Sequence, residues 1–210
     1  MPGSGGAGTL AEYRAPYPPE GTAPVELTTF NGPPAHVLLA HFVVVLVLLA
    51  ALGLVVCAIW PAIMARAGIG LPLLALVSLI LVPLTTEAGE WLEDRVDETA
   101  LVEEHAELGE SLLPWVIGLF VLSALLWFFR RRASAAAPAA GPADAPARSA
   151  AFADSLPFRV VAVVLSLVVG IGAAVQVYRI GHSGAEAVWK DNFSPTPLEK
   201  GGNEGGEEGE

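Results

Sequence analysis

Four histidines and two glutamates are the residues of this chain whose types and placement could do chemistry: His36, His41, His105, His182, Glu87 and Glu90. Two imidazoles from facing helices can ligate a haem iron. Imidazole combined with carboxylate suits zinc, iron or manganese. Ionisable groups at membrane depth can also move protons or ions. Which of these chemistries is available depends on whether the six residues meet in space.

Three of the six lie in the stretch Thr85–Glu110, which holds ten of the 22 acidic residues of the chain. Long apolar runs adjoin it on both sides, so it is predicted to connect two membrane helices. Such a connection can be a merely solvated loop. It becomes a candidate site if the other three histidines return to the same side of the membrane.

Four apolar runs define the elements that must position these residues. A helix needs about 20 apolar residues to cross a bilayer, and three of the runs reach that length, while the second does so once Thr85–Gly89 is added. The runs are His36–Trp60, Ile69–Leu84, Leu112–Phe129 and Phe158–Tyr178. They predict an all-α integral membrane protein, an antiparallel bundle of four transmembrane helices. The third helix is expected to start within EHAELGE and to end at Trp127–Phe129, and Pro83 is expected to kink the second.

The remaining segments are predicted from their composition. The expected organisation is a disordered Gly/Pro-rich tail at 1–34, helical hairpins at 35–132 with the acidic hairpin at 85–110, an Ala/Pro-rich flexible linker at 133–155, the fourth helix with a histidine motif at 156–190, and an acidic disordered tail at 191–210.

Charge distribution predicts the orientation and excludes some partners. Six arginines and only two acids lie in the two connections on one side: Arg66, Arg130, Arg131, Arg132, Arg148 and Arg159, with Asp144 and Asp154. The positive-inside rule places that side in the cytoplasm, with both termini and the acidic hairpin outside. The net charge of −11 comes with no basic stripe, so no nucleic-acid partner is expected. The single Cys57 allows no intrachain disulfide.

This topology brings all four histidines and both glutamates into one outer layer. His36 and His41 are about 140° apart on a helix, so they do not share a face, whereas Glu87 and Glu90 do. Arg179, near the outer end of the fourth helix, could pair with a haem propionate. No HExxH or CxxC spacing marks a metal site, and nothing around Ser111 or Ser183 is like a nucleophile elbow.

Four motifs resemble, in order, a family of bacterial membrane proteins known as domain of unknown function 2231: FNGPPAHVLLAHFVVVL, PLTTEAGEWLE, HAELGESLLPW and VQVYRIGHSGAEAVW. The resemblance covers His36 to Trp189. It implies a four-helix domain in the bacterial plasma membrane. It also implies a redox setting with redox partner proteins, because some relatives are joined to redox domains such as Rieske modules. It points to the same histidines and glutamates and to Trp189, although this chain has Val37 where many relatives have proline.

The leading hypothesis is therefore a bacterial redox or electron-transfer component, in contact with the lipid bilayer, that binds haem b through two of the four histidines. One alternative is a non-haem metal ion held by histidines with Glu87 or Glu90. The other is a non-enzymatic accessory or assembly subunit, in which the polar layer only orders the hairpin.

Overall fold

The computed structural model describes Thr29 and residues 34–136 and 155–190. The predicted disordered tails, except Thr29 and Pro34, and most of the predicted linker lie outside these residues. Within them no strand forms, and one isolated bridge pairs Thr29 with Pro34. Four helical spans in the described part are long and apolar enough to cross a membrane: Ala35–Ile59, Gly70–Glu93, Ala100–Ser134 and Leu156–Trp189. The predicted all-α membrane bundle is confirmed.

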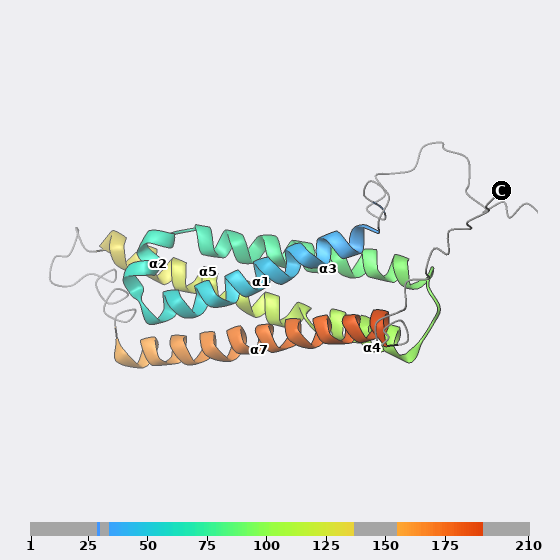
Figure 1. The fold of residues 1–210 in the computed structure, drawn as a ribbon. Coiled ribbons are helices and arrows are strands. Elements are labelled where there is room, and N and C mark those ends of the chain that lie inside the picture. The colour runs from blue at the N-terminus through green and yellow to red at the C-terminus, as the bar shows by residue number, and fades with distance from the viewer. Residues whose placement is uncertain (1–28, 30–33, 137–154, 191–210) are drawn as a thin grey trace, which may run out of the picture.

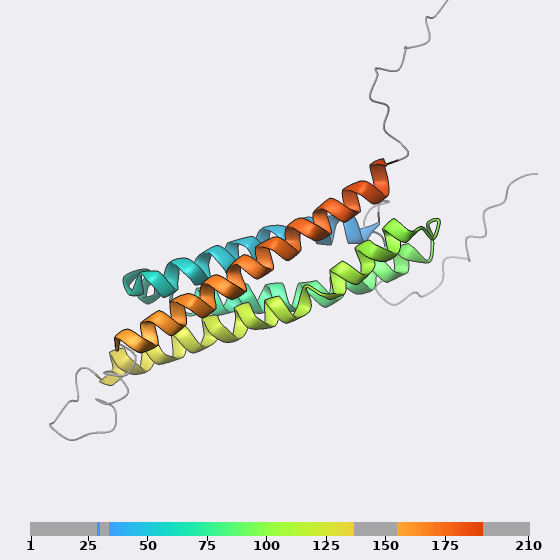
Figure 2. The ribbon, with the colours of Figure 1, turned by 90° about the horizontal axis from the view of Figure 1, so that it is seen from below.

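The four spans form a ring of antiparallel neighbours (Figure 1). Its helices are α1 (Ala35–Ile59), α2 (Pro61–Ala67), α3 (Gly70–Glu93), α4 (Ala100–Glu110), α5 (Leu113–Ala136) and α7 (Leu156–Trp189). Helices α1 and α5 each pack against both α3 and α7, and the short α4 lies along α7 and also touches α3. Figure 2 shows that α7 runs the full length of the bundle beside α1 and α5.

A short helix fills the connection between the first two spans. Trp60 leaves the helical conformation, with φ −114° and ψ 93°, and Pro61 begins α2 at a position where its missing N–H removes no helical bond. Gly68 ends α2 with φ +55°, a backbone conformation that favours glycine.

The third span differs from its prediction in three ways. It starts earlier, because Thr99 caps α4: its side-chain oxygen accepts a hydrogen bond from the N–H of Val102 at 3.3 Å. It is broken between α4 and α5, because Pro114 has no N–H to offer the carbonyl of Glu110. It also continues past the predicted end at Trp127–Phe129, so the first four residues of the predicted linker at 133–155 are helical.

The core of the bundle is built largely from small and branched side chains. Its buried cluster consists of Val43, Val47, Ala50, Ala51, Leu54, Ala75, Val82, Leu112, Val116, Leu119, Ala173 and Val177. Small residues let membrane helices approach closely. A Cβ added to Gly170 would lie 3.4 Å from the carbonyl oxygen of Ala51, so α7 and α1 cross backbone to backbone. Larger apolar side chains such as Leu52 face outward, as expected for contact with lipid.

Trp115 of α5 lies across Gly172 of α7. A Cβ added to Gly172 would overlap the six-membered ring of Trp115, whereas a Cβ added to Gly181 on the same helix would meet nothing within 4 Å. The indole therefore occupies the space that a side chain at position 172 would need.

Gly172→Ala is expected to lower the thermal stability of the bundle, because Trp115 must move to admit the methyl group. Overpacking of this kind costs about 1–3 kcal/mol. Gly181→Ala is the matched control. It should leave the midpoint temperature of thermal unfolding unchanged or raise it slightly, because alanine has a higher helix propensity than glycine. Thermal unfolding followed by circular dichroism in detergent checks both, and equal midpoints for the two variants would contradict the packing described.

Candidate functional site: a pair of histidines

One end of the bundle collects all four histidines. Here α1 begins, α3 and α7 end, and α4 lies between them (Figure 1). We refer to it as the histidine end. His36 lies in the first turn of α1, His41 one turn further in, His105 in α4, and His182 near the end of α7. The predicted common layer therefore exists, and the question becomes which side chains face inward.

His36 and His105 face each other. Their ring centroids are 6.2 Å apart and their planes are nearly perpendicular, at 88°. Both side chains are partly buried between the helices. Residues 69 positions apart in the chain are thus brought into contact because α1 and α4 both meet α7 and α3 at this end.

The His36 ring is fixed on α3. Its Nδ1–H donates to the carbonyl oxygen of Thr85 at 2.9 Å. Four residues later stands Gly89, and a Cβ there would lie 3.0 Å from both Cε1 and Nδ1 of the ring. In a helix the residue at i+4 sits above the carbonyl of residue i. Glycine at this position therefore uncovers the carbonyl for a side chain from another helix.

The His105 ring is fixed on α7 in the same manner. Its Nδ1 lies 3.1 Å from the carbonyl oxygen of Ile180 and 3.1 Å from Oγ of Ser183, whose hydroxyl donates to that same carbonyl at 3.0 Å. Gly184 again follows the accepting carbonyl by four residues, and a Cβ there would lie 2.9 Å from Cε1 of the ring. The serine adds a polar contact that has no counterpart at His36.

The two anchoring arrangements repeat across the two halves of the bundle. In the first half a histidine of α1 rests on a glycine of α3, and in the second a histidine of α4 rests on a glycine of α7. Helix α1 contacts α7 and helix α3 contacts α5, so the two halves pack side by side. The two rings occupy corresponding positions and meet between the halves.

These hydrogen bonds determine which ring nitrogen is available. A carbonyl only accepts, so Nδ1 carries the proton in both rings, and in a neutral imidazole the lone pair is then on Nε2. Histidines that ligate metals through Nε2 characteristically donate their other N–H to a backbone carbonyl or carboxylate. Both rings of the pair have this arrangement.

A buried glutamine holds α4, and with it His105, over the bundle. The side-chain amide of Gln176 donates to the carbonyl of Leu108 at 2.9 Å and to Oγ of Ser111, whose hydroxyl also bonds the Leu108 carbonyl at 2.7 Å. The helix break redirects the N–H of Leu112 to the carbonyl of Gly109, so the Leu108 carbonyl has lost its usual helical partner. Gln176 and Ser111 replace it.

The other two histidines face away from the core. His41 is exposed, and its Nδ1–H bonds the carbonyl of Val37 in its own helix. The side chain of His182 is 62% exposed, stacks on Tyr178 with ring centroids 6.0 Å apart, and lies 3.8 Å from a carboxylate oxygen of Glu186. The predicted angular separation of His36 and His41 thus places one ring inside the bundle and the other on its surface.

The predicted glutamates and arginine lie on the surface. Glu87 and Glu90 share a face and line, with Glu110 and Leu113, a hollow of about 640 Å³ beside Pro83. Among the residues that the structure describes, no group of three or more His, Cys, Asp or Glu side chains surrounds one point. The mixed histidine–glutamate metal site therefore stays a prediction. Arg179 and Trp189 are exposed on α7, and the pairing of Arg179 with a propionate also stays a prediction.

Comparison with known proteins places the chain in a family. The family model described as "Predicted membrane protein (DUF2231)" matches residues 32–197, which is most of the sequence. The chain belongs to the DUF2231 family. No curated protein and no solved structure matches it. Membership of DUF2231 supports a membrane protein and assigns no chemistry, so the chemistry has to be argued from the histidine pair.

The residues that position the two histidine rings in this DUF2231 protein were not predicted from the sequence. Thr85 and Ser183 bond the rings or share their acceptor, and Gly89 and Gly184 make room for them. A signal did exist, because the segments TTEAG and IGHSG both end on glycine four residues after the accepting carbonyl, at the same end of the bundle. Gln176 had a weaker signal, as an uncharged polar residue within an otherwise apolar span.

Gln176→Leu is expected to destabilise the bundle by about 1–3 kcal/mol, because the partly buried Leu108 carbonyl loses its amide donor. The matched control is Ser166→Ala on the same helix. The Ser166 hydroxyl is buried and has no partner among the described residues, so its removal should cost little or nothing. Thermal unfolding in detergent compares the two variants. A larger loss for Ser166→Ala would contradict the role given to Gln176.

Proposed function

We propose that this protein is a membrane-embedded electron-transfer component in which His36 and His105 hold a single haem b at the histidine end of the bundle. The main support for this proposal is the contact between His36 and His105. Two imidazoles meet at 6.2 Å between the two halves of the bundle, each anchored through Nδ1.

The separation of the rings suits ligation on opposite sides of one ion. Metal–imidazole bonds of about 2.0–2.1 Å on opposite sides of an ion put the two ring centroids roughly 6 Å apart. A tetrahedral site would draw them closer together. Two axial imidazoles are a standard ligand set for haem iron in helical bundles, and the perpendicular ring planes do not conflict with that role.

The surroundings of the rings also favour this role. The carbonyls of Thr85 and Ile180 hold the ring orientations, while Gly89 and Gly184 let each ring lie against a helix at a point where a side chain would collide with it. Carboxylates that could complete a mixed metal site are exposed instead, as Glu87 and Glu90 show. Haem bound between the rings would supply one-electron transfer, close enough to the membrane surface for a redox partner protein to approach.

We further propose that the protein lies in the bacterial plasma membrane with the histidine end and both termini outside. The described arginines other than Arg95 and Arg179 are gathered at the opposite end, with Arg130, Arg131 and Arg132 together at the end of the third span. The positive-inside rule supports a cytoplasmic location for that end.

Absorption spectroscopy of the full chain, expressed with haem supplied and purified in detergent, tests the cofactor. The purified protein is expected to show a Soret band and a reduced α-band. His36→Ala and His105→Ala should remove both bands. His41→Ala and His182→Ala are matched controls from the same end of the bundle and should retain them.

Two results would overturn the haem proposal. One is an unmodified protein that remains colourless although haem is supplied and the protein is folded. The other is loss of the bands to the same degree in all four variants. In either case the imidazole–carbonyl bonds would act only to join α1 to α3 and α4 to α7.

Orientation is tested by cysteine labelling in a Cys57→Ala background. A cysteine introduced as Ser194→Cys should react with a membrane-impermeant maleimide in whole cells. Ser149→Cys, in the segment between α5 and α7, should react only after lysis. The opposite pattern would reverse the topology.

A further inference from the structure

The two rings of the histidine pair are held by unequal hydrogen bonds. Nδ1 of His36 lies 2.9 Å from one acceptor, the carbonyl oxygen of Thr85. Nδ1 of His105 lies 3.1 Å from each of two acceptors, the carbonyl oxygen of Ile180 and Oγ of Ser183. An N–H that is shared between two acceptors forms a longer and weaker bond to each of them. The His105 ring therefore donates less strongly to its carbonyl than the His36 ring does.

The carbonyl of Ile180 is itself shared among three donors. In a continuous α-helix each carbonyl accepts the N–H of the residue four positions later, and α7 is continuous around Ile180, so Gly184 supplies the first donor. The hydroxyl of Ser183 is the second, at 3.0 Å, and Nδ1–H of His105 is the third. A carbonyl oxygen has two lone pairs. Three donors thus compete for two positions.

The carbonyl of Thr85 has the same geometry without a hydroxyl from its own side chain. The hydroxyl of Thr85 turns back to the carbonyl of Leu81 at 2.7 Å. The Thr85 carbonyl then accepts the helical N–H of Gly89 and the His36 ring, which is one donor for each lone pair. The hydroxyl of Ser183 is therefore the structural cause of the longer, divided bond at His105.

The environment of Ser183 makes this contact effective. The residue is only 4% exposed, so water does not screen its hydroxyl. A serine that bonds a carbonyl of its own helix usually has only a local effect. Ser123 of α5 is such a case, because its hydroxyl is buried and donates to the carbonyl of Phe120 at 2.9 Å. Ser183 differs from Ser123 because its oxygen also accepts from an imidazole.

The hydrogen bond at Nδ1 affects the chemistry at Nε2. A strong bond from Nδ1–H to an acceptor makes the ring a better electron donor through its other nitrogen. Because the bond is divided at His105 and undivided at His36, Nε2 of His105 is the weaker donor of the two. Hydrogen bonding of the axial ligands is one of the means by which a protein sets the reduction potential of haem iron.

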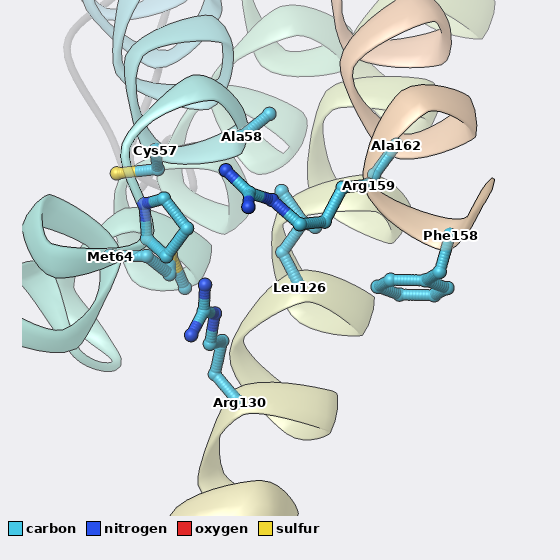
Figure 3. A pocket seen from close by; sticks show the side chains of 9 residues that line it. Cys57, Ala58, Met64, Leu126, Arg130, Phe158, Arg159 and Ala162 are labelled. Atoms are coloured by element: carbon cyan, nitrogen blue, oxygen red, sulfur yellow. The ribbon is translucent and has the colours of Figure 1, made fainter. Parts of the chain in front are cut away.

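Sulfur ligands are too far away to take the place of His105. Cys57 and the one described methionine, Met64, lie at the end of the bundle opposite the histidines. There they line a hollow of about 20 Å³ between α1, α2, α5 and α7 (Figure 3). Although cysteine and methionine can both ligate haem iron, neither can be exchanged for a weakened imidazole at the histidine end. A change made at Ser183 is therefore felt through His105.

We propose that Ser183 is a positioning residue that weakens His105 as an iron ligand relative to His36 and so raises the midpoint potential of the haem. This inference rests on the haem function proposed above and identifies a residue that sets its potential. Ser183 acts only through the His105 ring, by sharing the Nδ1–H bond and by competing for the carbonyl of Ile180.

Proton NMR of the haem-free full chain, labelled with nitrogen-15 at histidine, tests the hydrogen bond itself. In Ser183→Ala the His105 Nδ1–H bonds the Ile180 carbonyl alone, so its proton signal should move downfield toward that of His36. The His36 signal should not move. Ser123→Ala is the matched control, because it removes a buried hydroxyl with the same local bond, and it should change neither signal.

Redox titration of the haem-loaded chain tests the consequence. Ser183→Ala should lower the midpoint potential, so that the ratio of oxidised to reduced haem at a fixed poise rises about threefold, as expected when part of one hydrogen bond is redistributed. Ser183→Thr keeps a hydroxyl and should stay closer to the unmodified chain than Ser183→Ala does. Ser123→Ala should leave the potential unchanged.

The two measurements separate this inference from the haem proposal. A chain that binds no haem would overturn the haem proposal, and the effect on the potential with it. In a chain that does bind haem, the role of Ser183 alone would be overturned by a His105 proton signal that stays in place in Ser183→Ala, by an equal shift in Ser123→Ala, or by a midpoint potential that is unchanged or higher in Ser183→Ala.

Discussion

Polar backbone groups within a bilayer must find their partners inside the protein, and this constraint shapes the histidine end. Where the third span is broken, the N–H of Leu112 turns to the carbonyl of Gly109, and the carbonyl of Leu108 is satisfied by Gln176 and Ser111 instead. The break also sets α4 apart as a separate short helix along α7. His105 can then reach the carbonyl of Ile180. The position of one imidazole of the pair therefore depends on how the protein repairs a broken helical hydrogen-bond ladder.

Glycine lets both histidine rings reach the carbonyls that hold them. A helix carbonyl is normally covered by the side chain four residues later, and Gly89 and Gly184 remove that cover on α3 and α7. Both helical hairpins have a glycine four residues after the accepting carbonyl. The two rings therefore lie between the two halves of the bundle. The two seats differ in one respect, because the hydroxyl of Ser183 also contacts the His105 ring.

Much of the fold follows from the sequence because its causes are local. Twenty-residue apolar runs specify membrane helices, and the angular spacing of His36 and His41 already separates an inward from an outward ring. The break at Pro114 also had a local cause. It was not predicted, because Pro114 lies near the start of an apolar run that was interpreted as part of one continuous helix. The pairing of His36 with His105 could not be predicted, because it depends on helix rotation. Rotation is set by contacts such as Gly170 against Ala51, which apolar periodicity does not specify.

We propose that His36 and His105, and not the two exposed histidines, bind one haem through Nε2. Nitrogen-15 NMR of the full chain, labelled at histidine and recorded before and after haem addition, tests it most directly. If these two histidines hold the haem, the Nε2 signals of two of the four imidazoles will shift strongly or broaden, and His36→Ala and His105→Ala will identify them. Unchanged signals from these two, or changes confined to His41 and His182, would contradict it.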